Sequence, residues 1–272
     1  MKKIVLIFDG SNFSEAAFDF ACHMNSMNPV LLTGVFLSNR DYATAFQYGF
    51  GGGLVFTDWG LGEDDEQRAK ISIKRFEALC LNNGIDFRIH NGLGAYALSE
   101  INKESRFADL VIISSDLFYK NVGGEQPNEY MRSVLRDTEC PIILVPEEKF
   151  HFPSSIILTY DGTEASVYAI KQYSYLFPEW RQKKTALIYL GNDSIPDQVY
   201  IEELAARHFK DLTLFKFGAN AKYEFMSWLA GQKNPLLIAG AFGRSGLSEF
   251  FRRSFISEII MNYKTPVFIA HK

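Results

Sequence analysis

The chain repeats one pattern at a distance of about half its length. An apolar run near the start closes with Phe8-Asp9-Gly10-Ser11-Asn12-Phe13-Ser14, and a later one closes with Tyr160-Asp161-Gly162-Thr163-Glu164-Ala165-Ser166. The ends of the two copies also match, as Cys140-Pro141-Ile142-Ile143-Leu144-Val145 and Thr265-Pro266-Val267-Phe268-Ile269-Ala270. Solenoid units recur every ~20–50 residues, so a repeat of this length indicates a duplicated domain.

Length and composition agree with two globular domains, which we place at 1–148 and 153–272. A chain of 272 residues fits two domains of ordinary size. The net charge of −4 predicts neither a nucleic-acid nor a membrane partner. No apolar stretch approaches the ~20 residues of a membrane span. The three cysteines, Cys22, Cys80 and Cys140, are few, odd in number and far apart, which favours reduced thiols and a cytoplasmic location.

The periodicity of apolar residues alternates between that of buried strands and that of amphipathic helices. In the first half we expect strands at 3–8, 30–37, 85–90, 108–114 and 142–145, with helices at 13–24, 64–82, 96–105 and 129–137. In the second half we expect strands at 155–159, 185–190, 212–217, 236–239 and 267–270, with helices at 165–176, 197–209, 222–230 and 255–263. This order predicts two α/β domains, each a parallel sheet with helices on both faces.

One segment, 38–63, breaks the symmetry of the two halves. It places Phe46, Tyr48, Phe50, Phe56 and Trp59 around three consecutive glycines. A long loop within a compact domain is functional or disordered in most cases, and the aromatic residues argue against simple disorder. We favour a surface flap that packs on its own domain or on a protein partner over a substrate lid.

A strand that runs into a glycine-rich loop is the motif with the clearest chemistry. The strand 236–239 leads into Gly240-Ala241-Phe242-Gly243-Arg244-Ser245-Gly246, and the loop continues to Arg253-Ser254 before a helix. Glycines let a backbone approach an anion closely, and a helix N-terminus favours phosphate. Neither a dinucleotide fingerprint nor a Walker loop is present. The alternative is a plain turn whose glycines adopt positive φ.

These motifs together resemble the universal stress protein family, as a tandem pair over the whole chain. The resemblance rests on Asp161-Gly162 after a first strand, on Gly240-x-x-Gly243 after a fourth, and on Thr265-Pro266 before a fifth. It implies two five-stranded, Rossmann-like α/β sandwiches of the adenine-nucleotide-binding kind, related by a pseudo-two-fold. It also implies an intramolecular pseudo-dimer through the last strands, with a homodimer and an unknown protein partner as further partner expectations.

The resemblance also assigns ligand-binding residues, all in the second domain. Asp161 would meet the adenosine end of ATP, Gly240 and Gly243 would line the phosphates, and Ser254 would hold an outer phosphate. Thr159, Ala239 and Arg253 complete the set, and no metal is implied beyond nucleotide-bound Mg²⁺. Arg253 stands where the family pattern has glycine, so its side chain either crowds the anion or offers a bidentate contact. We favour crowding.

The first domain lacks these features. Ser114 and Leu117 replace the two glycines, Asp116 brings negative charge, and Asp9 is read as a cap of the following helix. We therefore expect a non-catalytic protein of stress response or signalling that binds an adenine nucleotide weakly in domain two. One alternative is a slow ATPase or other nucleotide-dependent enzyme, for which Glu249 is the carboxylate near the loop. A second is a ligand-free interaction scaffold.

Overall fold

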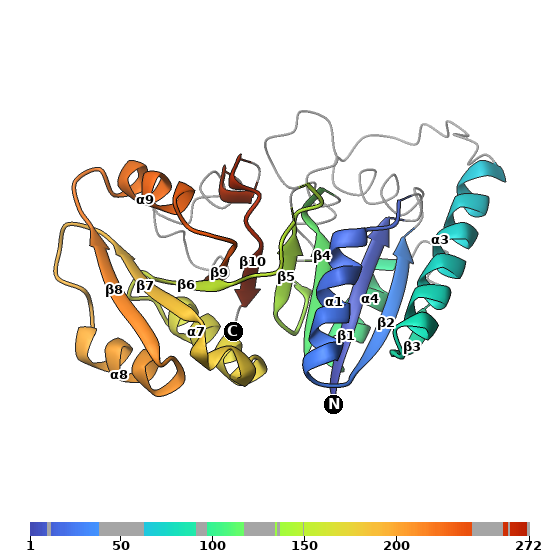
Figure 1. The fold of residues 1–272 in the computed structure, drawn as a ribbon, viewed down its shortest axis with the longest axis horizontal. Coiled ribbons are helices and arrows are strands. Elements are labelled where there is room, and N and C mark those ends of the chain that lie inside the picture. Colours follow the sequence, from blue (N-terminus) through green and yellow to red (C-terminus); the bar gives the residue numbers. More distant parts are fainter. Residues whose placement is uncertain are drawn as a thin grey trace, which may run out of the picture. The chain divides into compact units, whose positions relative to one another are not determined.

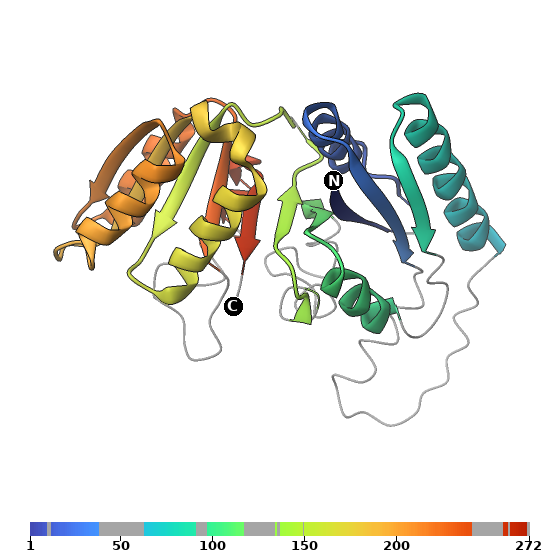
Figure 2. The same cartoon turned by 90° about the horizontal axis from the view of Figure 1, so that it is seen from below.

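The computed structural model of the 272-residue chain describes residues 1–9, 12–37, 63–90, 97–116, 134, 137–148, 150–240, 258–260 and 262–270. These form two compact units, Met1–Cys140 and Pro141–Lys272 (Figures 1 and 2). The aromatic segment 38–62 and the loop 241–257 lie outside the described residues. The domain limits at 148 and 153 stay a prediction.

The first unit is built on four parallel strands. They are β1 (Lys2–Asp9), β2 (Val30–Leu37), β3 (Asp86–His90) and β4 (Leu110–Ser114), in the spatial order β3-β2-β1-β4. The helices are α1 (Glu15–Met27), α3 (Glu63–Asn82) and α4 (Ala97–Arg106). Crossovers between parallel strands are right-handed, so the direction of a connection decides which face its helix covers. The connections through α1 and α3 run from β1 toward β3, whereas α4 connects β3 back to β4 on the far side of β1. Helices α1 and α3 therefore lie on one face of the sheet and α4 on the other.

An aromatic cluster fills the space between the first sheet and α1 and α3. Phe8 stacks on Phe13 and Phe36, with ring centroids 4.7 and 4.9 Å away. Phe76 of α3 packs edge-on against Phe8, Phe18 and Phe36. Buried aromatic side chains dominate core energetics through their large area, so this cluster fixes both helices to the sheet.

The described residues of the second unit contain six strands. They are β5 (Ile142–Val145), β6 (Ser155–Tyr160), β7 (Lys184–Leu190), β8 (Asp211–Phe217), β9 (Pro235–Gly240) and β10 (Val267–Ala270). Their order is β5-β10-β9-β6-β7-β8, and all pairs from β10 to β8 are parallel. The helices are α7 (Glu164–Leu176), α8 (Gln198–His208) and α9 (Ala221–Ala230), with a short η1 (Pro178–Gln182) before β7.

Both units repeat one strand order, as a duplicated sequence requires. The order β3-β2-β1-β4 in the first unit corresponds to β8-β7-β6-β9 in the second. The last strand of each sequence repeat, β5 and β10, forms an antiparallel pair with Val267 opposite Leu144. The predicted α/β class is therefore confirmed, while the pseudo-two-fold and the pseudo-dimer stay predictions. In the described part of the chain, no helix is both long and apolar enough to cross a bilayer.

The strands and helices match the sequence-based expectations to within a few residues at their ends. The strands β5 and β10 have the predicted limits, and Ser14 caps α1 by accepting from the backbone N–H of Ala17 at 3.2 Å. Our prediction omitted η1, where Trp180 is fully buried against aromatic neighbours. The helix expected at 129–137 lies mostly outside the described residues, as does the start of the helix expected at 255–263.

Candidate functional site

The predicted site lies where the strand order of the second unit reverses. β6 is paired with β7 on one side and with β9 on the other. After β6 the chain continues to β7 and β8 on one side, and it then returns to form β9 on the other side of β6. Asp161 follows β6 directly, and Gly240 ends β9. Ligands of open α/β sheets bind in the crevice at the carboxyl ends of strands at such a switch point.

Asp161 is held in a tight turn at the start of α7. Its Oδ1 accepts hydrogen bonds from the Thr163 backbone N–H at 3.0 Å and from the Thr163 hydroxyl at 2.6 Å. Thr163 in turn caps α7 by accepting from the backbone N–H of Ser166. Gly162 between them has φ +82°, in the left-handed region, where a Cβ would meet Pro196 at 2.9 Å. Each residue of the Asp-Gly-Thr sequence therefore has a structural role in this turn. Oδ2 is the Asp161 oxygen that remains to contact a ligand.

Tyr160, immediately before Asp161, is a fixed hydrogen-bond donor. Its side chain is buried, and its hydroxyl donates to the Pro196 carbonyl oxygen at 2.8 Å. Burial raises the pKa of Tyr160, and the nearby carboxylates of Asp197 and Asp161 raise it further. The hydroxyl thus stays protonated and ties the loop after β7 to the end of β6.

The structure places two predicted ligand-binding residues inside the sheet rather than at its surface. Thr159 is 2% exposed, and its hydroxyl donates to the Ile238 carbonyl oxygen at 2.7 Å, so it links β6 to β9. Ala239 is 1% exposed and is a core residue of β9. The assignment of both residues to a ligand site stays a prediction.

Gly240 has a structural reason to be glycine. A Cβ at this position would stand 2.6 Å from the carbonyl carbon of Ala165 and 2.7 Å from the backbone nitrogen of Ser166. The first turn of α7 therefore packs directly on the end of β9, which brings Asp161 and Gly240 to the same strand edge. Gly243, Arg253 and Ser254, the other predicted phosphate-binding residues, lie outside the described residues.

A separate cleft of about 840 Å³ opens at the carboxyl ends of β7 and β8. Its lining comes from the loops after both strands, from α9 and from the region of Glu258 and Tyr263. None of Thr159, Asp161, Ala239 or Gly240 belongs to this lining. The part of the predicted site that the structure describes is therefore outside this lining.

Two described carboxylates lower the positive charge around this cleft. Lys222 near the start of α9 is paired with the carboxylate of Glu258 at 2.7 Å. A Glu224 carboxylate oxygen accepts from the Gly218 backbone N–H at 3.3 Å, just before the same helix. A carboxylate at a helix N-terminus offsets the positive dipole end that would otherwise attract an anion.

Other residues stand at the corresponding strand ends of the first unit. Ser114, at the place of Gly240, is buried, and its hydroxyl oxygen accepts from the Asp116 backbone N–H at 3.2 Å. Phe8 and Phe13, on either side of the Asp9 loop, stack on each other instead of leaving an opening between them. Leu117 lies outside the described residues. The loss of phosphate-binding features in the first copy stays a prediction from its sequence.

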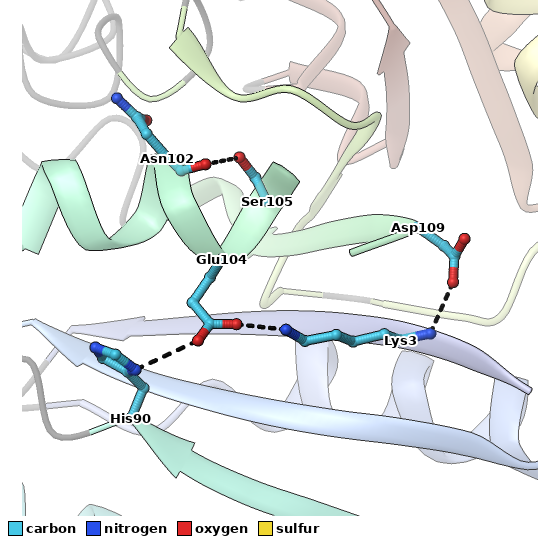
Figure 3. Close-up of polar contacts among 6 residues, drawn as sticks. All are labelled: Lys3, His90, Asn102, Glu104, Ser105 and Asp109. Atoms are coloured by element: carbon cyan, nitrogen blue, oxygen red, sulfur yellow. Dashed lines mark hydrogen bonds and ion pairs between the residues drawn. The ribbon is translucent and has the colours of Figure 1, made fainter. Parts of the chain in front are cut away.

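One ionic cluster in the first unit has no sequence signal (Figure 3). Glu104 of α4 accepts from the Lys3 ammonium at 2.6 Å and lies 3.4 Å from Nδ1 of His90. The Lys3 backbone N–H also donates to Asp109 at 2.8 Å. The three side chains come from β1, β3 and α4 and are a fifth to a third exposed, so the cluster attaches α4 to the sheet. Lys3 lies far from His90 and Glu104 in the sequence, so the cluster cannot be predicted without the order of the strands in the sheet.

Comparison with known proteins defines the class of this fold. No family model matches the chain, and no curated protein matches it. A solved universal stress protein from Archaeoglobus fulgidus DSM 4304 superposes with a TM-score of 0.72 at 13% identity, covering 100% of this chain and 96% of the other. A Pseudomonas aeruginosa protein assigned to the universal stress proteins gives a TM-score of 0.58 at 12% identity, covering 100% and 93%.

The chain therefore has the universal stress protein fold along its whole length. This confirms at the level of the fold the resemblance that the motifs indicated. At these identities the likeness defines architecture, and it carries no ligand or activity over to this chain.

Proposed function

We propose that this chain is a non-catalytic stress-response protein whose second unit binds an adenine nucleotide weakly between Asp161 and the loop after Gly240. The observation that supports this proposal is the position of these two residues on neighbouring strands at the switch point of the second sheet. The universal stress protein fold adds the expectation of a role in stress response.

The described contacts support weak rather than tight binding. Asp161 already accepts two hydrogen bonds through Oδ1, so a ligand has one carboxylate oxygen, Oδ2, to contact. The Thr159 hydroxyl is committed to Ile238. Arg253 stands in the sequence where a glycine would let phosphate reach the backbone, which adds a steric cost.

The test is to purify the protein, release any bound small molecule by denaturation and identify it by mass spectrometry. Calorimetric titration with Mg-ATP and a phosphate-release assay follow on the same sample. Weak binding without turnover agrees with the proposal. Steady phosphate release would favour the slow ATPase instead, and absence of binding at millimolar ATP would favour the ligand-free scaffold.

A pair of matched variants locates the site. Asp161→Ala should abolish the binding, whereas Asp9→Ala, the equivalent change in the first copy, should leave it unchanged. Circular dichroism on both variants controls for folding, because Asp161 also holds the turn before α7. Equal loss of binding in both variants, with both folded, would contradict a site in the second unit.

A further inference from the structure

The charged residues of the second unit are divided between the two edges of its sheet. At the carboxyl edge, where the strands end, the described residues carry more carboxylates than cations, among them Asp161, Asp193, Asp197 and Glu224. At the amino edge, where the strands begin, exposed cations are in excess, namely Arg181, Lys184, Arg207, Lys210 and Lys233. The net charge of −4 averages over this division, so it describes neither edge.

Three of these cations lie at the beginnings of strands of one sheet. Lys184 begins β7, Lys210 directly precedes β8, and Lys233 lies two residues before β9. Lys184 is level with Ser155 of β6 and with Asp211 of β8, and the Ser155 hydroxyl donates to the Lys233 carbonyl oxygen at 3.1 Å. The row from β9 through β6 and β7 to β8 therefore spans three strand spacings, or about 14 Å.

Two arginines join this row through hydrogen bonds to its backbone. Arg181 belongs to η1, and Arg207 lies in the last turn of α8. The Arg181 carbonyl oxygen accepts from the Lys210 backbone N–H at 3.0 Å, and the Arg181 guanidinium donates to the Arg207 carbonyl oxygen at 2.9 Å. The arginines and the strand-start lysines thus form one continuous positive surface, which we call the amino-edge row.

The charge of this row is not neutralised within the described part of the chain. There, the ammonium groups of Lys184, Lys210 and Lys233 form no ion pair and no hydrogen bond. Two exposed carboxylates, Glu179 and Asp211, lie at the same edge and are outnumbered. A helix C-terminus favours a nearby cation, which accounts for Arg207, but Lys184 begins a strand and has no such role. Unpaired cations in a row are suited to a ligand that carries several negative charges.

An exposed aromatic ring lies next to the two arginines. Tyr175, near the end of α7, is 57% exposed, and its ring meets that of His208 edge-on with centroids 5.5 Å apart. His208 directly follows Arg207 in the chain, so the tyrosine adjoins the amino-edge row. Proteins that bind single-stranded nucleic acid combine a positive surface that follows the phosphates with aromatic rings on which bases stack.

We propose that the amino-edge row of the second unit, with Tyr175, binds single-stranded nucleic acid without sequence preference. The cations neutralise phosphates of the strand, and an unpaired base stacks on the Tyr175 ring. A duplex keeps its bases stacked on one another, so it would use the cations alone. The surface is separate from the proposed nucleotide site, because Asp161 and Gly240 lie at the opposite, carboxyl edge of the same sheet.

The experiment titrates a fluorescein-labelled oligouridylate with the full-length protein and follows fluorescence anisotropy at several KCl concentrations. We expect a dissociation constant on the order of 10⁻⁵ M at physiological salt. The slope of log K against log[KCl] should be about −3, because each neutralised phosphate of a single strand contributes about −0.7. Lys184→Ala and Lys210→Ala should each flatten this slope by about 0.7. Tyr175→Ala should weaken binding about fivefold or more and leave the slope unchanged.

Matched controls come from exposed residues elsewhere in the chain. Lys74→Ala removes a cation from α3 of the first unit, and Tyr223→Ala removes a ring that is 78% exposed at the start of α9. Neither should change the affinity or the slope. Asp161→Ala should also leave binding unchanged, so this proposal and the proposed nucleotide site can fail independently. Circular dichroism checks that every variant is folded.

Three results would overturn the proposal. The first is no binding by the wild type, and the second is an equal effect of Lys210→Ala and Lys74→Ala. The third is unchanged affinity in Tyr175→Ala, or tighter binding of a duplex than of the single strand. If inorganic polyphosphate then binds as well as the oligouridylate, the row recognises a chain of phosphates and not the bases of a nucleic acid.

Discussion

Gly240 lies against the first turn of α7, so that a Cβ at Gly240 would stand 2.6 Å from the carbonyl carbon of Ala165. Both partners at this contact are backbone, which cannot rotate away as a flexible side chain does. The close approach joins the end of β9 to the start of α7, and it is the contact that brings the two halves of the candidate site together. The sequence does not distinguish a glycine needed for phosphate binding from one needed for packing. At Gly240 the structure shows the need for packing.

Gly240→Ala should therefore destabilise the second unit by about 1–3 kcal/mol, because an added methyl group forces a backbone shift in a well-packed region. Urea unfolding monitored by tryptophan fluorescence measures the change in the free energy of unfolding. Gly231→Ala is the matched control, since a Cβ there would make only an ordinary contact, 3.5 Å from the Trp228 carbonyl oxygen. If both variants unfold at the same urea concentration, the close approach at Gly240 is wrong.

Tyr173→Phe tests a buried hydroxyl. The Tyr173 side chain is fully buried among Phe177, Trp180, Phe209 and Phe268, and its hydroxyl has no hydrogen-bond partner. An unpaired buried polar group costs free energy, so its removal should leave stability unchanged or raise it by up to about 1 kcal/mol.

Tyr160→Phe is the contrasting variant, since its hydroxyl donates to the Pro196 carbonyl oxygen at 2.8 Å. It should lose about 1 kcal/mol, because the carbonyl oxygen then has to find another partner. Both changes in the free energy of unfolding can be measured in the same chemical unfolding series. A larger loss for Tyr173→Phe than for Tyr160→Phe would show that the Tyr173 hydroxyl is paired in solution.

His208 predicts a pH dependence of stability. Burial lowers the pKa of His208, and the nearby Arg181 lowers it further. A base whose pKa is lower in the folded state binds its proton more readily when unfolded, so stability falls as the pH drops from about 7 through the lowered pKa. The difference in unfolding free energy between wild type and His208→Gln should therefore shrink or reverse between pH 7 and 5. A difference that stays constant over this range would show that the histidine pKa is not shifted by folding.

The order of strands and helices along the chain and the helix limits were predictable because the signals for them are local. Continuous apolar runs identified the buried strands. Ser14 and Gly84 lie at the beginning of α1 and just after the end of α3, where capping chemistry favours them. Because the sequence repeats, the strands and helices expected in one half supported those expected in the other. The short η1 was missed because Pro178 suggests only a break, whereas the burial of Trp180 depends on distant aromatic partners.

The candidate site was predictable only in part, since side-chain direction depends on the sheet pleat and on neighbours far along the chain. Asp161 and Gly240 lie at one strand edge, whereas the side chains of Thr159 and Ala239 are buried. The cluster of Lys3, His90 and Glu104 could not be found from spacing, because only the strand order brings β3 and β1 under α4.

Arg253 provides the last prediction, at the position where this chain departs from the glycine pattern that the resemblance implies. Backbone N–H groups bind phosphate only when the anion comes within ~3 Å of them, and a glycine permits that approach. We expect the wild type to bind Mg-ATP weakly or not at all, and Arg253→Gly to tighten binding by about tenfold or more, which is ~1.4 kcal/mol. Arg252→Gly removes the same charge one residue earlier and should not tighten binding. Calorimetric titration of the three proteins decides the matter. Tight binding by the wild type that is lost in Arg253→Gly would show that the arginine holds the phosphate through a charge-assisted contact.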